Sequence, residues 1–462
     1  VGVFRIRTLF FTEFDTMTML DWPRHMPADV LAPGALHFYD AATAFRVGAT
    51  DRQMRNALTQ QLIGIKVALR RKRLAPEVVL SLAHSLRALQ GLKELEVDVS
   101  FTSVGDHGAC QLAQGIGTLQ RLQSLELLLA GAGLGHSGCE RFAKELSSLR
   151  GLTRLKLDLS LNDIGDTGLR ELSKSLRSAL LLRALVLDLN RNRISDPGVA
   201  CLAQVVLELP ALSEFEVALF DNRVGEDGAR QMAATMRGLR QLSRLVLGLN
   251  RNAVSEAGVQ DIAHALNSHS LRDLELDLSV SSVGWAGAHD LGMALSSLQG
   301  LQNLSIDLNV NHVGSAGARL LAQAISSQQS LVSLRLLASG NRIREVGARE
   351  LSQALANLRL LVNLELDVSG NGIGDAGACE LARAMGGLAK LCRLIADLRG
   401  NLVGDNGERE LARAVGELPK LGRLELRLGG NCRSSGAGPL HHELKNAVRK
   451  LQTGGCICDF SY

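Results

Sequence analysis

Acidic side chains recur at a fixed spacing along the chain and supply its first candidate chemistry. Seven aspartates stand about 30 residues apart, or a multiple of that: Asp98, Asp158, Asp188, Asp277, Asp307, Asp367 and Asp397. Aspartate is a poor strand former, and like charges side by side destabilise a sheet. Such a column attracts a cation or a basic segment of another protein, at a rate that falls as salt is added.

Three further residues complete the candidate partner-binding set. Glu275 belongs to a column of glutamates two residues before the aspartates, while Phe220 and Trp285 occupy positions that are polar in most equivalent segments. Exposed aromatic side chains are enriched at interaction hot spots. Two alternatives stay open. In one, Trp285 lies flat on its neighbour and fills a gap. In the other, nearby arginines neutralise the acidic column: Arg154, Arg244, Arg335, Arg393 and Arg399.

The sequence predicts no catalysis, no metal site and no cofactor. It contains no GxxxxGK[ST] phosphate loop, no HExxH and no GxSxG motif. His441, His442 and Glu443 are adjacent, but no third metal ligand is evident. The many carboxylates follow a periodic pattern, whereas catalysis needs one unique constellation of residues.

Composition and charge favour a protein partner in a reducing compartment, which we take to be the cytoplasm. The 51 Lys and Arg nearly balance the 47 Asp and Glu, so nucleic acid is not expected. The cluster Arg70–Arg73 is interpreted as a solvated loop, with a nucleic-acid patch or import signal as the alternative. No stretch of ~18 apolar residues predicts a membrane span. The eight cysteines contain no CxxC pair, which indicates free thiols.

One unit of sequence is repeated along most of the chain. Its opening leucines are spaced by 30 residues, with one step of 29 between Leu242 and Leu271. The opening leucines are Leu92, Leu122, Leu152, Leu182, Leu212, Leu242, Leu271, Leu301, Leu331, Leu361, Leu391 and Leu421. In each unit a period-two segment predicts a strand with one buried face, and leucines at helical spacing then predict a helix. Asp166 is expected to cap the helix of its own unit.

An asparagine column marks the place where each unit turns inward. It comprises Asn162, Asn192, Asn222, Asn252, Asn311, Asn341, Asn371, Asn401 and Asn431. An amide side chain both donates and accepts hydrogen bonds, so stacked asparagines can satisfy backbone groups that are hidden from water. Thr102, Ala132 and Ser281 interrupt this structural ladder, and weaker local order is expected there.

The motif LxLxxN, seen at Leu157, Leu159 and Asn162, is followed by IGDxG and a helical LxxxL. This pattern resembles the leucine-rich repeat family, and in particular its ribonuclease-inhibitor-like class in the 30-residue form common in protists. The resemblance implies an α/β solenoid, or horseshoe, with parallel strands on the concave face and helices on the convex face. Curvature also follows without the resemblance. Neighbouring strands lie ~4.8 Å apart whereas packed helices need ~8–10 Å, so a stack of such units must bend with the sheet on its concave side.

The chain is expected to have three parts. Residues 1–61 form an N-terminal leader and cap, residues 62–440 form a solenoid of about 13 units, and residues 441–462 form a C-terminal cap helix and a tail. The chain begins with Val, so Met17 or Met19 is the expected natural start. Cys456 and Cys458 are assigned to a frayed tail, with a metal or lipid site as the alternative.

The leading functional hypothesis is a non-catalytic scaffold that binds another protein on an acidic concave surface. One alternative is a GTPase-activating protein resembling the Ran activator, although the tail here is basic to neutral and that family's tail is strongly acidic. The other alternative is the ligand-sensing part of a larger receptor or cytoskeletal assembly. The sequence does not fix the oligomeric state.

Overall fold

Strands and helices alternate along the computed structural model of the chain. The structure describes residues 4–5, 9–10, 62–71, 74–267, 270–431, 440–453 and 455–461. The chain divides into two units, which are described separately. The first comprises residues 1–193 and 204–212, and the second comprises residues 194–203 and 213–462.

The first unit holds one parallel sheet. Its strands are β1 (Phe4–Arg5), β2 (Leu9–Phe10), β3 (Leu62–Ala68), β4 (Glu94–Asp98), β5 (Ser124–Leu128), β6 (Arg154–Asp158) and β7 (Ala184–Asp188). Its helices are α3 (Pro76–Arg87), α4 (Gly105–Gly117), α5 (His136–Leu146) and α6 (Gly165–Leu176), and α7 (Asp196–Val206) is divided between the units. Strands β3 to β7 pair in sequence order, while β1 and β2 both pair with β3.

The second unit holds another parallel run of strands in sequence order. The strands are β8 (Glu214–Ala218), β9 (Arg244–Gly248), β10 (Asp273–Asp277), β11 (Asn303–Asp307), β12 (Ser333–Leu337), β13 (Asn363–Asp367), β14 (Arg393–Asp397), β15 (Arg423–Arg427) and β16 (Ile457–Ser461). The helices are α8 (Glu226–Gly238), α9 (Ser255–Leu266), α10 (Gly284–Ser297), α11 (Gly314–Ser326), α12 (Arg344–Ala356), α13 (Gly374–Gly386), α14 (Asp405–Glu417) and α15 (Leu440–Thr453).

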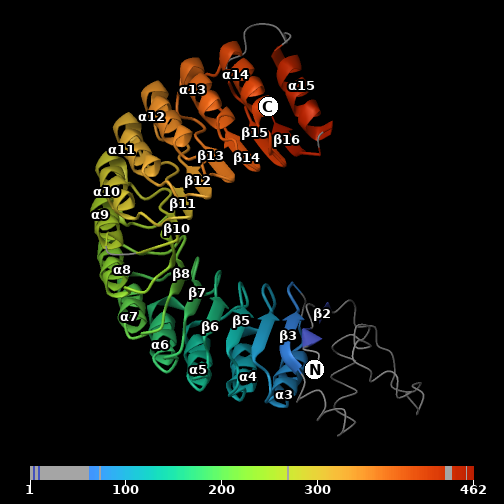
Figure 1. The fold of residues 1–462 in the computed structure, drawn as a ribbon. Helices are drawn as coiled ribbons and strands as arrows, with labels where there is room; N and C mark the ends of the chain where they lie inside the picture. The colour runs from blue at the N-terminus through green and yellow to red at the C-terminus, as the bar shows by residue number, and fades with distance from the viewer. Residues whose placement is uncertain are drawn as a thin grey trace, which may run out of the picture. The chain divides into compact units, whose positions relative to one another are not determined.

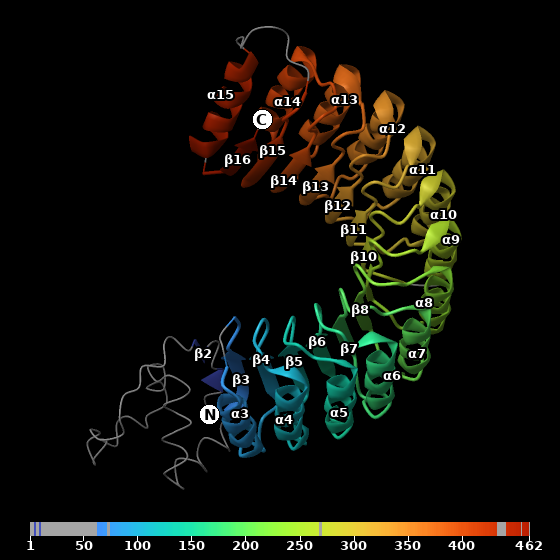
Figure 2. The ribbon, with the colours of Figure 1, turned by 180° about the vertical axis from the view of Figure 1, so that it is seen from behind.

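Apolar side chains at alternate strand positions form the core between the sheet and the helices. Leu274, Leu304 and Leu334 stand in register on neighbouring strands and are almost fully buried. Successive helices pack against one another, and they contribute Leu and Ala to the same core. In the second unit the strands line the inner side of a curve and the helices its outer side (Figures 1 and 2). The predicted alternation of parallel strands and outer helices is therefore confirmed within each unit.

The asparagine side chains bind the preceding repeat. Asn371 Nδ2 donates to Ala338 O at 2.8 Å, and its Oδ1 accepts the N–H groups of Asn341 (2.8 Å) and Ile343 (3.1 Å). Asn341, Asn401 and Asn431 make the same kind of bridge. Each repeat therefore completes the hydrogen bonding of the repeat before it.

The same bridge extends through the rest of the column. Asn192 and Asn252 donate to carbonyls 33 residues earlier, and Asn162 accepts the N–H of Leu134. Asn222 accepts the N–H of Ile194, and Asn311 accepts that of Val283.

Two of the interrupting residues make local bonds instead. Thr102 Oγ1 donates to Val99 O at 2.5 Å, and Ser281 Oγ donates to Ser279 O at 3.3 Å. Both side chains are buried, as is Ala132. Weaker order at these three positions stays a prediction.

The prediction that Asp166 caps its own helix is wrong. Helix α6 has no side-chain cap. At the equivalent position Asp375 Oδ1 instead accepts the N–H groups of Gly404 (2.9 Å) and Gly407 (2.6 Å), which belong to the start of α14 in the next repeat. Asp106 accepts the N–H of Gly135 in the same way. The cap joins two repeats because each carboxylate points at the neighbouring helix rather than at its own.

The C-terminal end also differs from expectation. The expected cap helix is present as α15, but the residues after it form strand β16 rather than a frayed tail. Strand β16 pairs with β15, with Cys458 in register with Leu424. Most of residues 1–61 lie outside the described residues, so the expected N-terminal leader and cap stays a prediction.

We expect Asn371→Ala to lower the free energy of unfolding of the second unit by about 3 kcal/mol. The substitution leaves the buried N–H groups of Asn341 and Ile343 and the carbonyl of Ala338 without this partner, and each unpaired group costs ~1–3 kcal/mol. Urea unfolding followed by circular dichroism measures the change. The control is Asn406→Ala on the exposed face of α14. Equal midpoints for the two variants would contradict the role assigned to the ladder.

Candidate partner-binding surface

The seven predicted aspartates end their strands, on the sheet face that points away from the helices. Asp98, Asp158 and Asp188 close strands of the first unit. In the second unit the same position is held by Asp277, Asp307, Asp367 and Asp397. Most are half-buried, whereas Asp397 is only 2% exposed. The strand order therefore places the predicted column along one face within each unit.

Each of these aspartates also serves the local backbone. Its Oδ1 accepts the N–H of the residue two positions later, as in Asp158 with Ser160 (3.0 Å) and Asp307 with Asn309 (2.9 Å). The other five make the same bond. This local bond turns the chain out of the strand. The column thus has a structural role that the sequence hypothesis did not include, although the spacing Asp-x-Ser/Asn signals it.

Cations on neighbouring strands neutralise most of the glutamate column. Lys156 pairs with Glu126 at 2.7 Å, and Arg335 Nε pairs with Glu365 at 3.1 Å. The other pairs between neighbouring strands are Lys66 with Glu96 and Arg244 with Glu216, whereas Glu425 pairs with Arg427 of its own strand β15. Glu275 differs, because its neighbours in register are Val246 and Ser305 and it forms no ion pair among the described residues.

Carboxylates gather on β10 and β11. We call Asp273, Glu275, Asp277 and Asp307 the acidic patch. The first three alternate along the exposed side of β10, and Asp307 lies in register beside Asp277. The nearest strand arginines are engaged elsewhere, because Arg244 pairs with Glu216 and Arg335 with Glu365.

Burial and neighbouring carboxylates together change the acidity of Asp307. Burial raises the pKa of Asp307 to about 6, and the charges of Asp277 and Asp367 add to the increase. The N–H of Asn309 and the charge of Arg335 oppose it. Placing further negative charge here is costly, so the patch is a favourable position for a cation from outside.

The two aromatic candidates lie in different layers. Phe220 follows β8 and is half-buried, with the guanidinium carbon of Arg251 5.5 Å from the centre of its ring. Trp285 is 63% exposed near the start of α10, in the helix layer. Such exposure does not fit the alternative in which Trp285 fills a gap. The structure does not bring Trp285 onto the strand face with the acidic patch.

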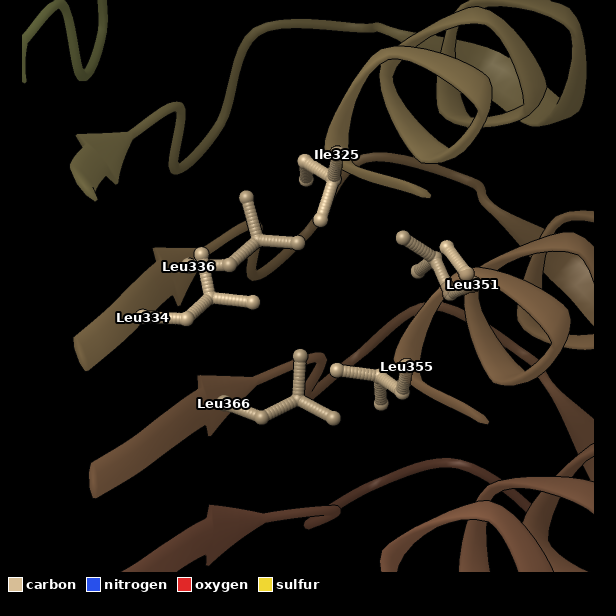
Figure 3. A pocket seen from close by; sticks show the side chains of 7 residues that line it. Ile325, Leu334, Leu336, Leu351, Leu355 and Leu366 are labelled. Atoms are coloured by element: carbon tan, nitrogen blue, oxygen red, sulfur yellow. The ribbon is translucent and has the colours of Figure 1, made fainter. Parts of the chain in front are cut away.

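The interior between β12, β13 and the helices offers no room for a cofactor. A cavity of about 10 Å³ is lined by Ile325, Leu334, Leu336, Leu351, Ala354, Leu355 and Leu366 (Figure 3). This volume holds at most one water, and an entirely apolar lining gives water no hydrogen bonds. The described part of the chain contains no cluster of three His, Cys, Asp or Glu side chains suited to a metal. Nor does it contain a helix with the length and apolarity needed to cross a bilayer.

The sequence hypothesis missed a basic group on the same unit. Lys390, Arg393, Lys420 and Arg423 are exposed where β14 and β15 begin. The repeated pattern KLCRL at 390–394 and KLGRL at 420–424 could have revealed them. The strand face of the second unit is therefore not uniformly acidic.

Comparisons with known proteins agree with the repeat pattern. The family model described as "Leucine Rich repeat" matches residues 155–173, 185–203 and 363–382. No curated protein matches the chain in sequence.

The chain is also similar to solved structures, among them the following three. A chain of the Rad7 and Elc1 complex in yeast is 16% identical, with 86% of this chain and 90% of that chain covered and a TM-score of 0.45. An internalin of Listeria monocytogenes is 14% identical, with coverages of 91% and 94% and a TM-score of 0.43. A leucine-rich repeat protein of Leptospira interrogans is 17% identical, with coverages of 91% and 98% and a TM-score of 0.44. At such identities and TM-scores nothing further follows from the likeness.

Asp307→Asn tests whether the pKa of Asp307 is raised in the folded chain. The folded pKa of about 6 lies above the unfolded value of 3.8, so the folded chain binds more protons between these values. The stability contributed by this group is complete below the unfolded pKa and is lost as pH rises through about 6. We expect wild type to lose about 1 kcal/mol more than Asp307→Asn between about pH 4 and about pH 8, a figure reduced because the side chain is partly exposed.

Urea unfolding midpoints at the two pH values measure this difference. Asparagine keeps an oxygen that can accept the Asn309 N–H, so the variant changes charge without removing the local bond. Glu345→Gln, at an exposed position of α12, is the control. The same pH dependence in wild type and Asp307→Asn would refute the raised pKa of Asp307.

Proposed function

The chain is a leucine-rich repeat protein, and we propose that it works as a non-catalytic scaffold whose strand face binds another protein. The repeats bury one apolar side of strands β3 to β15 and of helices α3 to α14 in the core. The other side of each strand carries polar and charged residues that differ from repeat to repeat. Recognition by a rigid, repetitive sheet face uses these differences.

The acidic patch is the part of this surface to which we assign a basic partner segment. The observation that carries the proposal is Glu275. Glu275 forms no ion pair among the described residues, because Arg244 on the neighbouring strand β9 pairs with Glu216 instead, and Asp273 and Asp277 flank Glu275 on β10. A lysine or arginine of a partner would supply the missing charge. The remaining predicted aspartates would contribute long-range attraction.

The cysteines support a reducing compartment, and we propose the cytoplasm. All seven cysteines in the described residues are free thiols. Burial, aided by the charge of Asp106, raises the pKa of the Cys139 thiol to about 12. A thiol of this kind packs as a small apolar side chain and does not react.

The two alternatives stay predictions. No contact in the described residues favours a GTPase-activating protein resembling the Ran activator or the ligand-sensing part of a larger assembly. A stimulated-GTPase assay on a panel of small GTPases separates the first alternative from a scaffold. The ribonuclease-inhibitor-like class also stays a prediction.

A labelled lysine-rich peptide tests the acidic patch. We expect D273N/E275Q to weaken binding of this peptide to the full chain about tenfold, because two of the carboxylates that would hold its cations are neutralised. The control variant E256Q/E345Q makes the same change of net charge at exposed positions of α9 and α12. Fluorescence anisotropy at several salt concentrations measures the affinity.

The control should bind like wild type, and added salt should reduce the difference between wild type and D273N/E275Q. If both double variants lose the same affinity, the peptide senses only net charge. The acidic patch would then not be the binding site.

A further inference from the structure

We propose that the basic residues at the start of β14 and β15 bind an acidic segment of a partner protein. We call Lys390, Arg393, Lys420 and Arg423 the basic rim. This inference goes beyond the proposed function, which concerns a basic segment on the acidic patch of β10 and β11.

The four cations of the basic rim stand close together on successive repeats. Arg393 and Arg423 lie in register at the first position of adjacent parallel strands, whose spacing is ~4.8 Å. Lys390 and Lys420 precede them by three residues in each repeat, and all four side chains are exposed. None of them forms an ion pair within the described residues.

The fold does not require positive charge at these positions. The equivalent first strand residues of β10 to β13 are Asp273, Asn303, Ser333 and Asn363. Like charges on directly neighbouring strands destabilise a sheet. The change to arginine in two consecutive repeats therefore works against the stability of the isolated chain, and an external anion would remove that penalty.

The carboxylates of the same strands are engaged by other arginines. Arg399 Nη2 lies 2.7 Å from Asp397 Oδ2, and Arg427 Nη1 lies 3.5 Å from the same oxygen. Arg427 also pairs with Glu425. Of the carboxylates nearby, Asp459 on β16 and Glu417 at the end of α14 are exposed and make no ion pair among the described residues. None of these carboxylates pairs with Lys390, Arg393, Lys420 or Arg423, so the positive charge of the basic rim is not neutralised within the described residues.

Apolar side chains on both sides of the basic rim indicate a protein partner. Ile457 on β16 is in register beside Arg423 and is 72% exposed. On the other side Leu360, at the position equivalent to Lys390 one repeat earlier, is 41% exposed. The surface thus runs from apolar Leu360 across the basic rim to apolar Ile457. A partner segment with aspartate or glutamate at its centre and apolar residues at its ends matches this arrangement. Arginine favours carboxylates because its planar guanidinium can donate two parallel hydrogen bonds to one carboxylate.

Nucleic acid matches the same surface less well. Binding of single strands relies on aromatic side chains that stack on the bases. The basic rim and its two neighbours contain none. We therefore assign the basic rim to an acidic protein segment, and nucleic acid becomes an outcome of the test.

The test uses the full chain and a labelled peptide with a central run of glutamates and a leucine at each end. We expect R393Q/R423Q to weaken its binding at least tenfold. The control R319Q/R349Q removes two arginines from exposed positions of α11 and α12 that also form no ion pair among the described residues, and it should bind like wild type. Thermal unfolding of each variant shows whether it is folded. A second variant, Ile457→Ser, should weaken binding a few-fold without any change of charge.

Three results would overturn the proposal. The first is equal affinity of wild type and R393Q/R423Q for the peptide, and the second is an equal loss of affinity in the control R319Q/R349Q. The third is a single-stranded oligonucleotide that binds more tightly than the peptide and whose binding is also weakened by R393Q/R423Q. The lysine-rich peptide separates this proposal from the proposed function. Its binding should not fall in R393Q/R423Q, and D273N/E275Q should not weaken binding of the acidic peptide.

Discussion

The structure depends on one recurring hydrogen-bonded bridge, made by an asparagine side chain to the repeat that precedes it. The side-chain amide of Asn371 forms hydrogen bonds with backbone groups of Asn341, Ile343 and Ala338, which point inward, away from water. A buried backbone group without a partner is costly, so a repeat is complete only when its successor is in place. The aspartates that cap the next helix, such as Asp375, also join neighbouring repeats, but in the opposite direction along the chain.

This dependence of each repeat on its neighbour explains why one sequence unit recurs along the chain and which positions of the unit tolerate substitution. The leucines and the asparagine serve the stack, and the last strand aspartate serves the turn of its own repeat. The first and third strand positions are free to differ, and in the second unit they differ by sign of charge. Carboxylates gather on β10 and β11, whereas the basic rim lies on β14 and β15. Two patches of opposite sign on one run of strands favour a partner with the complementary arrangement of charge and disfavour one bound in reverse.

Period and composition were enough to predict the alternation of strand and helix, because both depend on neighbours within one repeat. The inter-repeat cap was not predicted, since the direction of the Asp106 and Asp375 carboxylates depends on the offset between consecutive helices. The local bond of Asp158 could have been predicted from Ser160 two residues later. Strand β16 follows the last leucine-rich unit and carries no leucine. Only the alternation of Cys456 and Cys458 with Ile457 hinted at it.

The candidate surface was predicted in part for a similar reason. A column of acidic residues is visible in the sequence, but its neutralisation by Lys156 or Arg335 depends on which strands are adjacent and in what register. Register also separates Glu275, beside Val246 and Ser305, from the paired glutamates. Equally, the sequence alone predicts Arg393 as a neutralising charge, whereas in the structure it lies in register beside Arg423.

Hydrogen exchange of the backbone amides, followed by mass spectrometry or NMR, tests the asparagine bridge most directly. The amides of Asn341 and Ile343, which donate to Asn371 from outside any strand or helix, should exchange as slowly as those of β12 and β13. Exchange of these two amides at the fast rate of exposed loops would contradict the account.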